Sequence, residues 1–184
     1  MSDRSATIAP DEAARAARLK SLGFLARFAF LLALFYLPLL YEPIDKNVVE
    51  PFTRAIAVVS AVVLNAIGQD VVRTGTTITS GPFGVSIRNG CNGVEAMAFL
   101  AAATLAFPVP WRKRLAAAAA GCALVQVLNL LRIVTLYLLQ RYAPQYFELF
   151  HLAIWQTVIG GACIAFFYTW TRRAMPITDV AHGR

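Results

Sequence analysis

A single arginine lies inside an apolar segment that is long enough to cross a lipid bilayer. The segment runs from Leu115 to Leu139, 25 residues, and Arg132 is its only charged residue. A helix of that length spans the ~30 Å of hydrocarbon in a bilayer. A guanidinium near the bilayer centre costs from ~3 to ~10 kcal/mol, so it is normally kept only where it faces a polar cavity and a partner. Arg132 is therefore a candidate functional residue.

Three further segments are apolar and close to the same length. They are Phe24 to Tyr41, Gly93 to Phe107 and Leu152 to Trp170, and the second is short unless Cys91 and Asn92 lie in the membrane interface. Hydrophobic residues make up 58% of the chain and charged residues 15%, which is more apolar surface than a soluble domain of 184 residues can bury. We expect an all-α integral membrane protein, a polytopic bundle of about four transmembrane helices.

The basic residues predict how these helices are oriented. Of 17 lysines and arginines, 11 fall in three segments that flank the spans: Arg4 to Arg27, Arg112 to Arg114 and Arg172 to Arg184. Such flanks usually lie in the cytoplasm, so the net charge of +7 indicates topology and not nucleic acid. Three cytoplasmic segments require an even number of crossings between neighbours. Ala55 to Ile67, with 13 residues, is then expected to be a short helix on the outer face.

This topology divides the chain into three parts. We expect a cytoplasmic tail over residues 1–22, a membrane-embedded catalytic domain over residues 23–173 and a cytoplasmic tail over residues 174–184. The first span follows basic residues, as a signal peptide would, but no small-x-small cleavage site follows Tyr41. We interpret it as an uncleaved anchor.

An unusual turn precedes the second span. Residues Val71 to Arg88 alternate polar and apolar side chains around Ser80-Gly81-Pro82-Phe83-Gly84, which predicts a small extracytoplasmic β-hairpin. The chain then reaches Asn89-Gly90-Cys91-Asn92-Gly93, whose glycines favour a tight turn. Cys91 is therefore expected at the outer N-terminus of a membrane helix, where a partial positive charge favours a thiolate over a thiol.

Other polar side chains reach the same level of the membrane. Gln126, Asn129 and Arg132 are spaced at i, i+3 and i+6, so they form a polar stripe along one side of their helix. His151 opens the last apolar segment beside an external loop over Gln140 to Phe150. A helix N-terminus disfavours an imidazolium, which would leave the ring available as a base. The cysteine, the arginine and the histidine therefore converge on one plane.

Two neighbouring residues have both a structural and a functional interpretation. Glu95 is three residues after Asn92, the spacing of a capping box, and would satisfy the first helical turn. Otherwise it would pair with Arg132 or orient His151. Trp155 lies one turn after the histidine and either walls the site or anchors the helix at the interface.

Other small residues are expected to serve packing. Cys122 and Cys163 lie in mid-span among small apolar residues, where cysteine packs as a small apolar side chain. An odd total of three cysteines argues against a disulfide framework. Gly160-Gly161 and the pair Ala117 and Gly121 have the small side chains that let helices approach closely. The sequence has no metal-ligand spacing or phosphate-binding glycine loop, and we expect no cofactor and no metal.

In their order along the chain, these residues resemble the exosortase/archaeosortase family. Cys91 opens a span within Asn-Gly-Cys-Asn-Gly-Val-Glu, Arg132 lies late in the next span within Asn-Leu-Leu-Arg-Ile, and His151 opens the last. The resemblance covers about Ala55 to Arg173, and the compact length is similar to the exosortase H subgroup. The family usually has Cys-Ser-Gly where this chain has Cys91-Asn92-Gly93, so the serine is replaced.

The resemblance implies a sortase-like cysteine peptidase or transpeptidase of the bacterial inner membrane, with its site facing the periplasm. Its substrates would be exported proteins with a PEP-CTERM-like tail, made of a short motif, a transmembrane helix and a basic cluster. For the H subgroup the motif contains Ile-Pro-Thr-Leu and Trp-Gly. Cys91 would form a thioester that an unknown acceptor or water resolves. His151 would move the proton, and Arg132 would either stabilise the oxyanion or raise the thiolate fraction.

Two other classes of protein fit parts of the sequence. A small membrane transporter or assembly factor would bind an anionic ligand through Arg132 and would be insensitive to thiol alkylation. That interpretation leaves the cysteine turn and the interface histidine unexplained. A purely structural membrane subunit would tolerate Arg132→Leu.

Overall fold

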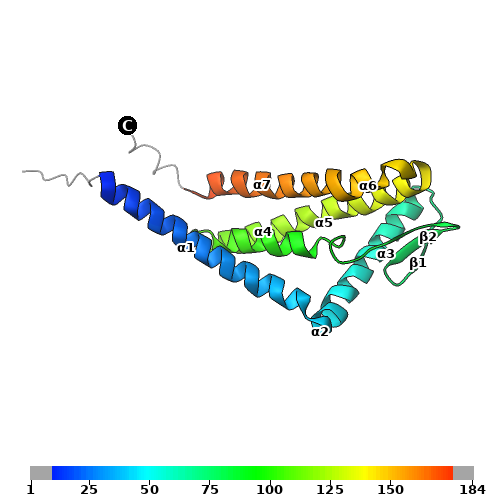
Figure 1. Ribbon diagram of the computed structural model, residues 1–184, viewed down its shortest axis with the longest axis horizontal. Coiled ribbons are helices and arrows are strands. Elements are labelled where there is room, and N and C mark those ends of the chain that lie inside the picture. Colours follow the sequence, from blue (N-terminus) through cyan, green and yellow to red (C-terminus); the bar gives the residue numbers. More distant parts are fainter. Residues whose placement is uncertain (1–9, 176–184) are drawn as a thin grey trace, which may run out of the picture.

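The computed structural model describes residues 10–175, and helices that run back and forth along one axis dominate it (Figure 1). The helices are α1 (Pro10–Tyr36), α2 (Glu42–Ile44), α3 (Glu50–Ala66), α4 (Val94–Ala106), α5 (Trp111–Tyr142), α6 (Phe147–Leu149) and α7 (Trp155–Ala174). The strands are β1 (Val72–Thr74), β2 (Thr77–Ser80) and β3 (Phe83–Ser86). Short 3-10 turns at Leu37–Leu40 and Pro144–Tyr146, and π-helical turns at Asp45–Val49 and Phe150–Ile154, join neighbouring helices.

Four helical segments are long and apolar enough to cross a membrane. They are Arg18–Leu40, Glu42–Ala66, Trp111–Tyr142 and Pro144–Ala174, and the expected all-α polytopic architecture is confirmed. One member of the set differs from the sequence prediction, because Glu42–Ala66 qualifies by length and composition whereas α4 is a shorter apolar helix.

The helix before the sheet is longer than the sequence pattern indicated. Its charged residues pair one turn apart, Lys46 with Glu42 and Arg54 with Glu50. Such i,i+4 pairs are compatible with a continuous helix. The helical segment therefore begins at Glu42, well before the apolar stretch that begins at Ala55. In Figure 1, α3 begins close to the C-terminal end of α1. From there it runs further away from the N-terminal end of α1. The expected short length is wrong, because Glu42–Ala66 is long and apolar enough to cross a membrane, and the expected place on the outer face stays a prediction.

The described parts of the three basic segments meet at one end of the bundle. Lys113 Nζ, at the start of α5, donates to the backbone oxygen of Ala174 at 3.4 Å. A cavity at this end is lined by Lys20 of α1, Pro108 between α4 and α5, and Met175 after α7. This clustering is what the positive-inside pattern requires. Helix α1 is continuous from Pro10, so the expected boundary after residue 22 falls inside a helix. Residues 1–9 and 176–184 of the expected tails lie outside the described residues.

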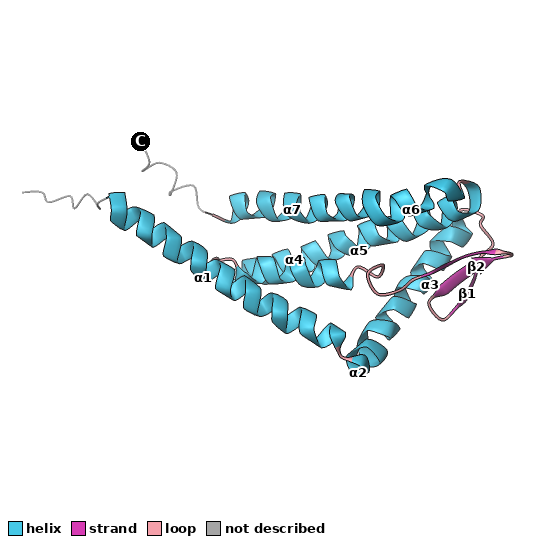
Figure 2. Cartoon of the chain, viewed as in Figure 1, coloured by secondary structure: helices cyan, strands magenta, loops and turns pink. Residues whose placement is uncertain are grey.

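The expected hairpin is one half of a three-stranded antiparallel meander, in the order β1-β2-β3 (Figure 2). The predicted turn at Gly81-Pro82 joins β2 to β3, and Gly75, with φ +62°, turns the chain from β1 into β2. The second turn was not predicted, although a glycine between threonines is an ordinary turn signal. One face of the sheet, including Ile78 and Val85, packs on α3 and α5.

The predicted close packing of helices is found at the small residues of α5 and is absent at the glycine pair of α7. A Cβ on Gly121 would lie 2.7 Å from Leu100 Cδ2 and 3.2 Å from Phe166 Cε1, so α4 and α7 approach the backbone of α5 there. Gly160 and Gly161 have no atom within 4 Å of a Cβ position. The expected close approach at this pair is therefore wrong for contacts within the described chain.

The segment before α7 is helical and not an external loop. Helix α5 continues to Tyr142, and Pro144 starts a 3-10 turn that leads into α6 and a π-helical turn. Proline at the first position of a helix supplies a favourable φ and has no N–H to leave unpaired, so this start signal lay inside the segment predicted as a loop. His151 consequently lies in the π-helical turn, beyond the first helical turn, and not at the helix N-terminus.

Candidate active site

A short loop between β3 and α4 carries Cys91. Cys91 N donates to the backbone oxygen of Arg88 at 2.9 Å, and Gly90 has a positive φ of +83°, so the chain turns sharply before the cysteine. The side chain of Glu95, on the first turn of α4, accepts a hydrogen bond from Gly90 N at 2.9 Å. The thiol is half-buried and is not in a disulfide. It lies two residues before Gly93, the N-cap of α4, close to the expected position.

Asn92 is the internal support of this loop. It is fully buried, and its Oδ1 accepts from Val94 N at 3.1 Å while its Nδ2 donates to Thr53 Oγ1 at 3.0 Å and to Asn89 Oδ1 at 3.2 Å. Asn89 in turn donates to Asp45 Oδ1 at 2.7 Å. The asparagine that replaces the family's usual serine thus ties the cysteine loop to the start of α3.

The polar stripe of α5 faces the cysteine loop. Gln126 Nε2 donates to the backbone oxygen of Asn92 at 3.1 Å, and a Cβ on Gly93 would lie 3.3 Å from Asn129 Cγ. Arg132 Nη1 donates to the backbone oxygen of Gly90 at 3.2 Å. The three stripe residues therefore lie next to successive residues of the cysteine loop. This loop is the polar surface that the stripe was expected to face.

Arg132 is 2% exposed and joins two segments of the chain at the thiol. Its Nη2 donates to Cys91 Sγ at 3.6 Å and to the backbone oxygen of His151 at 3.3 Å. Within residues 10–175, no aspartate or glutamate forms an ion pair with it. Of the atoms in these contacts, only the sulfur can carry a negative charge.

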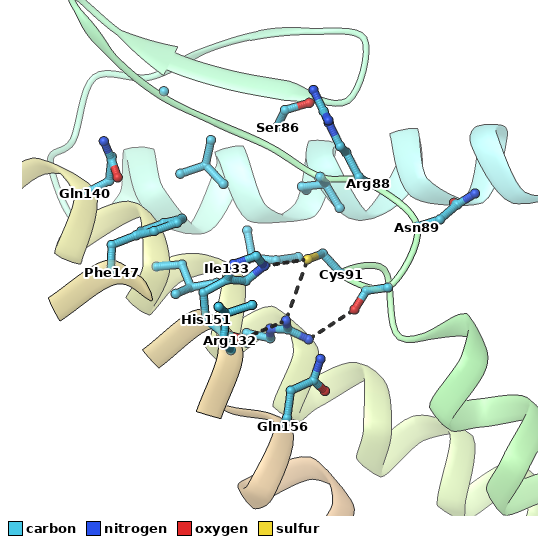
Figure 3. Close-up of a pocket in the computed structure, with 16 residues that line it drawn as sticks. Ser86, Arg88, Asn89, Cys91, Arg132, Ile133, Gln140, Phe147, His151 and Gln156 are labelled. Carbon is cyan, nitrogen blue, oxygen red and sulfur yellow. Dashed lines mark hydrogen bonds between the residues drawn. The ribbon is translucent and has the colours of Figure 1, made fainter. Parts of the chain in front are cut away.

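His151 contacts the same sulfur through its ring. Its Nε2 lies 3.2 Å from Cys91 Sγ, within hydrogen-bonding distance. The ring of Phe147, one turn earlier, lies 5.5 Å from the imidazole between centroids, with a tilt of 37°. Figure 3 shows the thiol joined by dashed lines to both the imidazole and the guanidinium. A π-helical turn, which is often found at functional sites, holds the histidine.

Two other candidate residues support the site from outside it. Glu95 bonds the loop at Gly90, and no hydrogen bond in the described chain joins it to Arg132 or His151. Trp155 packs against a core cluster that includes Leu100 and does not line the cavity around the thiol. Asn129 is fully buried, and neither of its side-chain polar atoms has a partner among the described residues.

A cavity of about 550 Å³ opens beside the thiol, a volume in the usual range for ligand sites. It is lined by the continuous segment from Gly84 to Cys91, by residues of α5 and by residues of α6, the π-helical turn and α7. Sequence reasoning missed Thr53, Asp45 and the Phe147 ring. Asp45 and Thr53 contact the cysteine loop about 40 residues further along the chain, and no local sequence pattern around them predicts such a contact.

The family model for transmembrane exosortases (Exosortase_EpsH) matches residues 19–169. No curated protein and no solved structure matched. The matched region is most of the 184 residues and contains Cys91, Arg132 and His151. The chain therefore belongs to the transmembrane exosortase family.

Proposed function

We propose that this exosortase is a membrane-embedded cysteine transpeptidase or protease that cleaves exported proteins near their C-terminal tails. The observation that carries the proposal is the position of Cys91 Sγ between His151 Nε2 and Arg132 Nη2, at 3.2 Å and 3.6 Å. A nucleophile, a base within hydrogen-bonding reach and a cation beside the sulfur are the parts that acyl transfer through a thiol needs.

In the first half of the reaction, Cys91 loses its proton to His151 and the thiolate attacks the scissile carbonyl carbon. The C–S bond forms as the carbonyl π electrons move to oxygen. When this tetrahedral intermediate collapses, the C–N bond breaks and the imidazolium gives its proton to the leaving amine. The products are a thioester on Cys91 and a free C-terminal tail.

In the second half, a nucleophilic group of an acceptor, or water, attacks the thioester. His151 takes the proton of the nucleophile, the C–S bond breaks, and the thiolate is restored. With water the outcome is hydrolysis, and with an amine or hydroxyl acceptor it is transfer. The cavity beside the thiol provides room for either nucleophile.

Arg132 is assigned to the thiolate that forms when His151 takes the proton of Cys91. A buried guanidinium without a carboxylate partner is costly, and the sulfur is the group in its contacts that can take the opposite charge. The same N–H groups lie near the carbon under attack, so a share in stabilising the oxyanion is compatible with this role. The two backbone contacts also hold the cysteine loop against the π-helical turn.

We infer that the substrates carry PEP-CTERM-like tails, a motif followed by a transmembrane helix and a basic cluster. The resemblance to the H subgroup suggests a motif with Ile-Pro-Thr-Leu and Trp-Gly. The substrate's own helix would lie against the bundle in the bilayer of the inner membrane, with its motif at the periplasmic level of Cys91. The basic ends of the described helices gather away from that level, which supports this orientation.

The contacts of Arg132 weigh against the alternative of a transporter or assembly factor with an anionic ligand. The guanidinium is 2% exposed and already contacts two carbonyl oxygens and a sulfur. Its Nε has no hydrogen-bond partner among the described residues, but this atom is buried, whereas an anion site would present unpaired N–H groups toward a ligand.

The central experiment follows a reporter that ends in such a tail and is co-expressed with the enzyme. Hydroxylamine is added as the acceptor, because it converts a thioester to a hydroxamate that mass spectrometry detects at the new C-terminus. The wild-type enzyme should yield the hydroxamate, and Cys91→Ala should reduce cleavage at least ~10³-fold, as expected for loss of a nucleophile.

Cys122→Ala is the matched control, because Cys122 lies in mid-span of α5 and outside the cavity. It should cleave the reporter at the wild-type rate. Cleavage that persists in Cys91→Ala, or that is lost equally in Cys122→Ala, would remove the thiol mechanism.

A further inference from the structure

Strand β3 leads directly into the cysteine loop and is an edge strand. The sheet order is β1-β2-β3, so β3 pairs with β2 on one side only. Its residues Gly84 to Ser86, and the loop that follows to Cys91, form one wall of the cavity that holds the thiol. An open edge of this kind can accept another strand, and this one ends beside a nucleophile.

The hydrogen-bond register shows which backbone groups of β3 face away from β2. Ile87 N donates to the backbone oxygen of Thr76 at 3.0 Å, so Ile87 faces β2. Residues of an antiparallel strand face the partner alternately. Val85, opposite Ile78, therefore also faces β2, and Gly84 and Ser86 direct their N–H and C=O groups to the open edge.

The packing leaves this edge available. Val85 and Ile87 belong to the apolar cluster that joins the sheet to α3 and α5, so the helices cover one face of the sheet. Figure 3 shows the side chains of Ser86 and Arg88 directed away from Cys91 and His151. Neither side chain therefore occupies the space between β3 and the helices that bear the thiol's partners.

We propose that the substrate binds as an added fourth strand on β3, with the residues before its scissile bond paired to the outward backbone groups of Gly84 and Ser86. This rests on the proposed function. An exported substrate with a C-terminal anchor would enter from the outer side and continue into the bilayer, and β3 likewise leads along the chain through the cysteine loop into the apolar helix α4. The added strand is therefore parallel to β3. Main-chain pairing supplies affinity, and alternate side chains of the substrate are left to provide specificity.

Proline at residue 86 tests the pairing from the enzyme's side. Ser86→Pro removes an N–H at the open edge without removing a bond to β2, because proline is tolerated on an edge strand. Ser86→Ala loses the same hydroxyl, which pairs with Thr77 Oγ1 at 3.2 Å, but keeps the N–H. With the tail-bearing reporter, Ser86→Pro should cleave roughly tenfold more slowly than Ser86→Ala, the effect of about one backbone hydrogen bond.

Arg73→Pro is the matched control on the opposite edge of the sheet. Arg73 pairs with Ile78, which faces β3, so by the same alternation Arg73 faces away from β2. It should cleave the reporter at the wild-type rate. Equal rates for Ser86→Pro and Ser86→Ala would overturn the β3 pairing, whereas the thiol mechanism would still stand on the hydroxamate from the wild-type enzyme.

Disulfide trapping tests the same pairing without requiring cleavage or the proline variant. In a Cys91→Ala background, Ser86→Cys is combined with single cysteines at six successive reporter residues before the scissile bond. A strand beside β3 should form disulfides at every second reporter position, because side chains alternate between the faces of a sheet. Disulfides without this period, or none at all, would overturn the added strand. Failure of the wild-type enzyme to form any hydroxamate would instead contradict the proposed function.

Discussion

At the scale of single residues, the guanidinium of Arg132 holds the cysteine loop and the π-helical turn of His151 together through both terminal nitrogens. Nη1 bonds the carbonyl of Gly90, and Nη2 is shared between the thiol and the carbonyl of His151. A lysine ammonium presents one nitrogen at the end of a flexible chain and cannot reach these positions together. Charge and fork geometry are therefore both needed at this position.

Arg132→Lys and Arg132→Gln separate these two contributions. Arg132→Lys should lose most cleavage, about 10²-fold, the scale of removing one transition-state donor. Arg132→Gln should lose more, because the charge opposite the sulfur is also gone. The rates are measured with the tail-bearing reporter and hydroxylamine. Near wild-type cleavage by Arg132→Lys would show that a point charge suffices and that the forked contacts are dispensable.

At the scale of elements, the approach of the cysteine loop to α5 depends on Gly93. Its φ of +77° is a left-handed conformation, and a Cβ there would lie 2.9 Å from Gln126 Nε2. A side chain would both strain the backbone and push the loop away from the helix that bears Arg132. The glycine therefore allows the loop that carries Cys91 to approach the helix that carries Arg132.

Gly93→Ala is expected to lower the free energy of unfolding by about 1–3 kcal/mol, from backbone strain and the close contact. Cleavage should fall together with the thermal midpoint measured in detergent. Gly161→Ala is the matched control, because Gly161 is helical with open space around it. That change should leave the thermal midpoint unchanged or raise it, since alanine favours a helix by up to about 1 kcal/mol over glycine. An undisturbed Gly93→Ala enzyme would contradict the need for close approach.

At the scale of the whole molecule, the bundle separates a basic end from a reactive end. The part of α1 around Lys20, the turn before α5 and the end of α7 lie together. The sheet and α6 lie at the other end (Figure 1). Large apolar side chains stay exposed along the helices between these ends, which suits contact with lipid. Under the proposed function, cleavage takes place at one surface of the membrane.

Thiol labelling of intact spheroplasts tests this orientation. In a Cys91→Ala background, Gln145→Cys near the reactive end should react with a membrane-impermeant maleimide. Trp111→Cys, at a residue that is 64% exposed at the basic end, should react only after the membrane is permeabilised. The expectation follows from the arginines and lysine after Trp111, which disfavour export. Labelling of Trp111→Cys in intact spheroplasts would reverse the orientation.

Patterns that depend on neighbours along the chain were predicted well. The apolar segments, the turn at Gly81-Pro82 and the stripe from Gln126 to Arg132 all appear in the structure. Boundaries were predicted less well, because helix Glu42–Ala66 continues through charged residues and Pro144 starts a helix inside an expected loop. The local density of charged residues is a weak guide to helix boundaries where i,i+4 ion pairs keep a polar stretch helical.

What the sequence determined by itself was the membrane class and three of the four long apolar helices, since length and composition act locally. Only the tertiary structure decided that Cys91, Arg132 and His151 meet within 3.6 Å and that Asn92 anchors the loop to α3. It also decided that β3 leaves an open edge beside the thiol. Contacts between helices depend on which helix faces pack against each other, and this is decided by side-chain packing across the whole bundle.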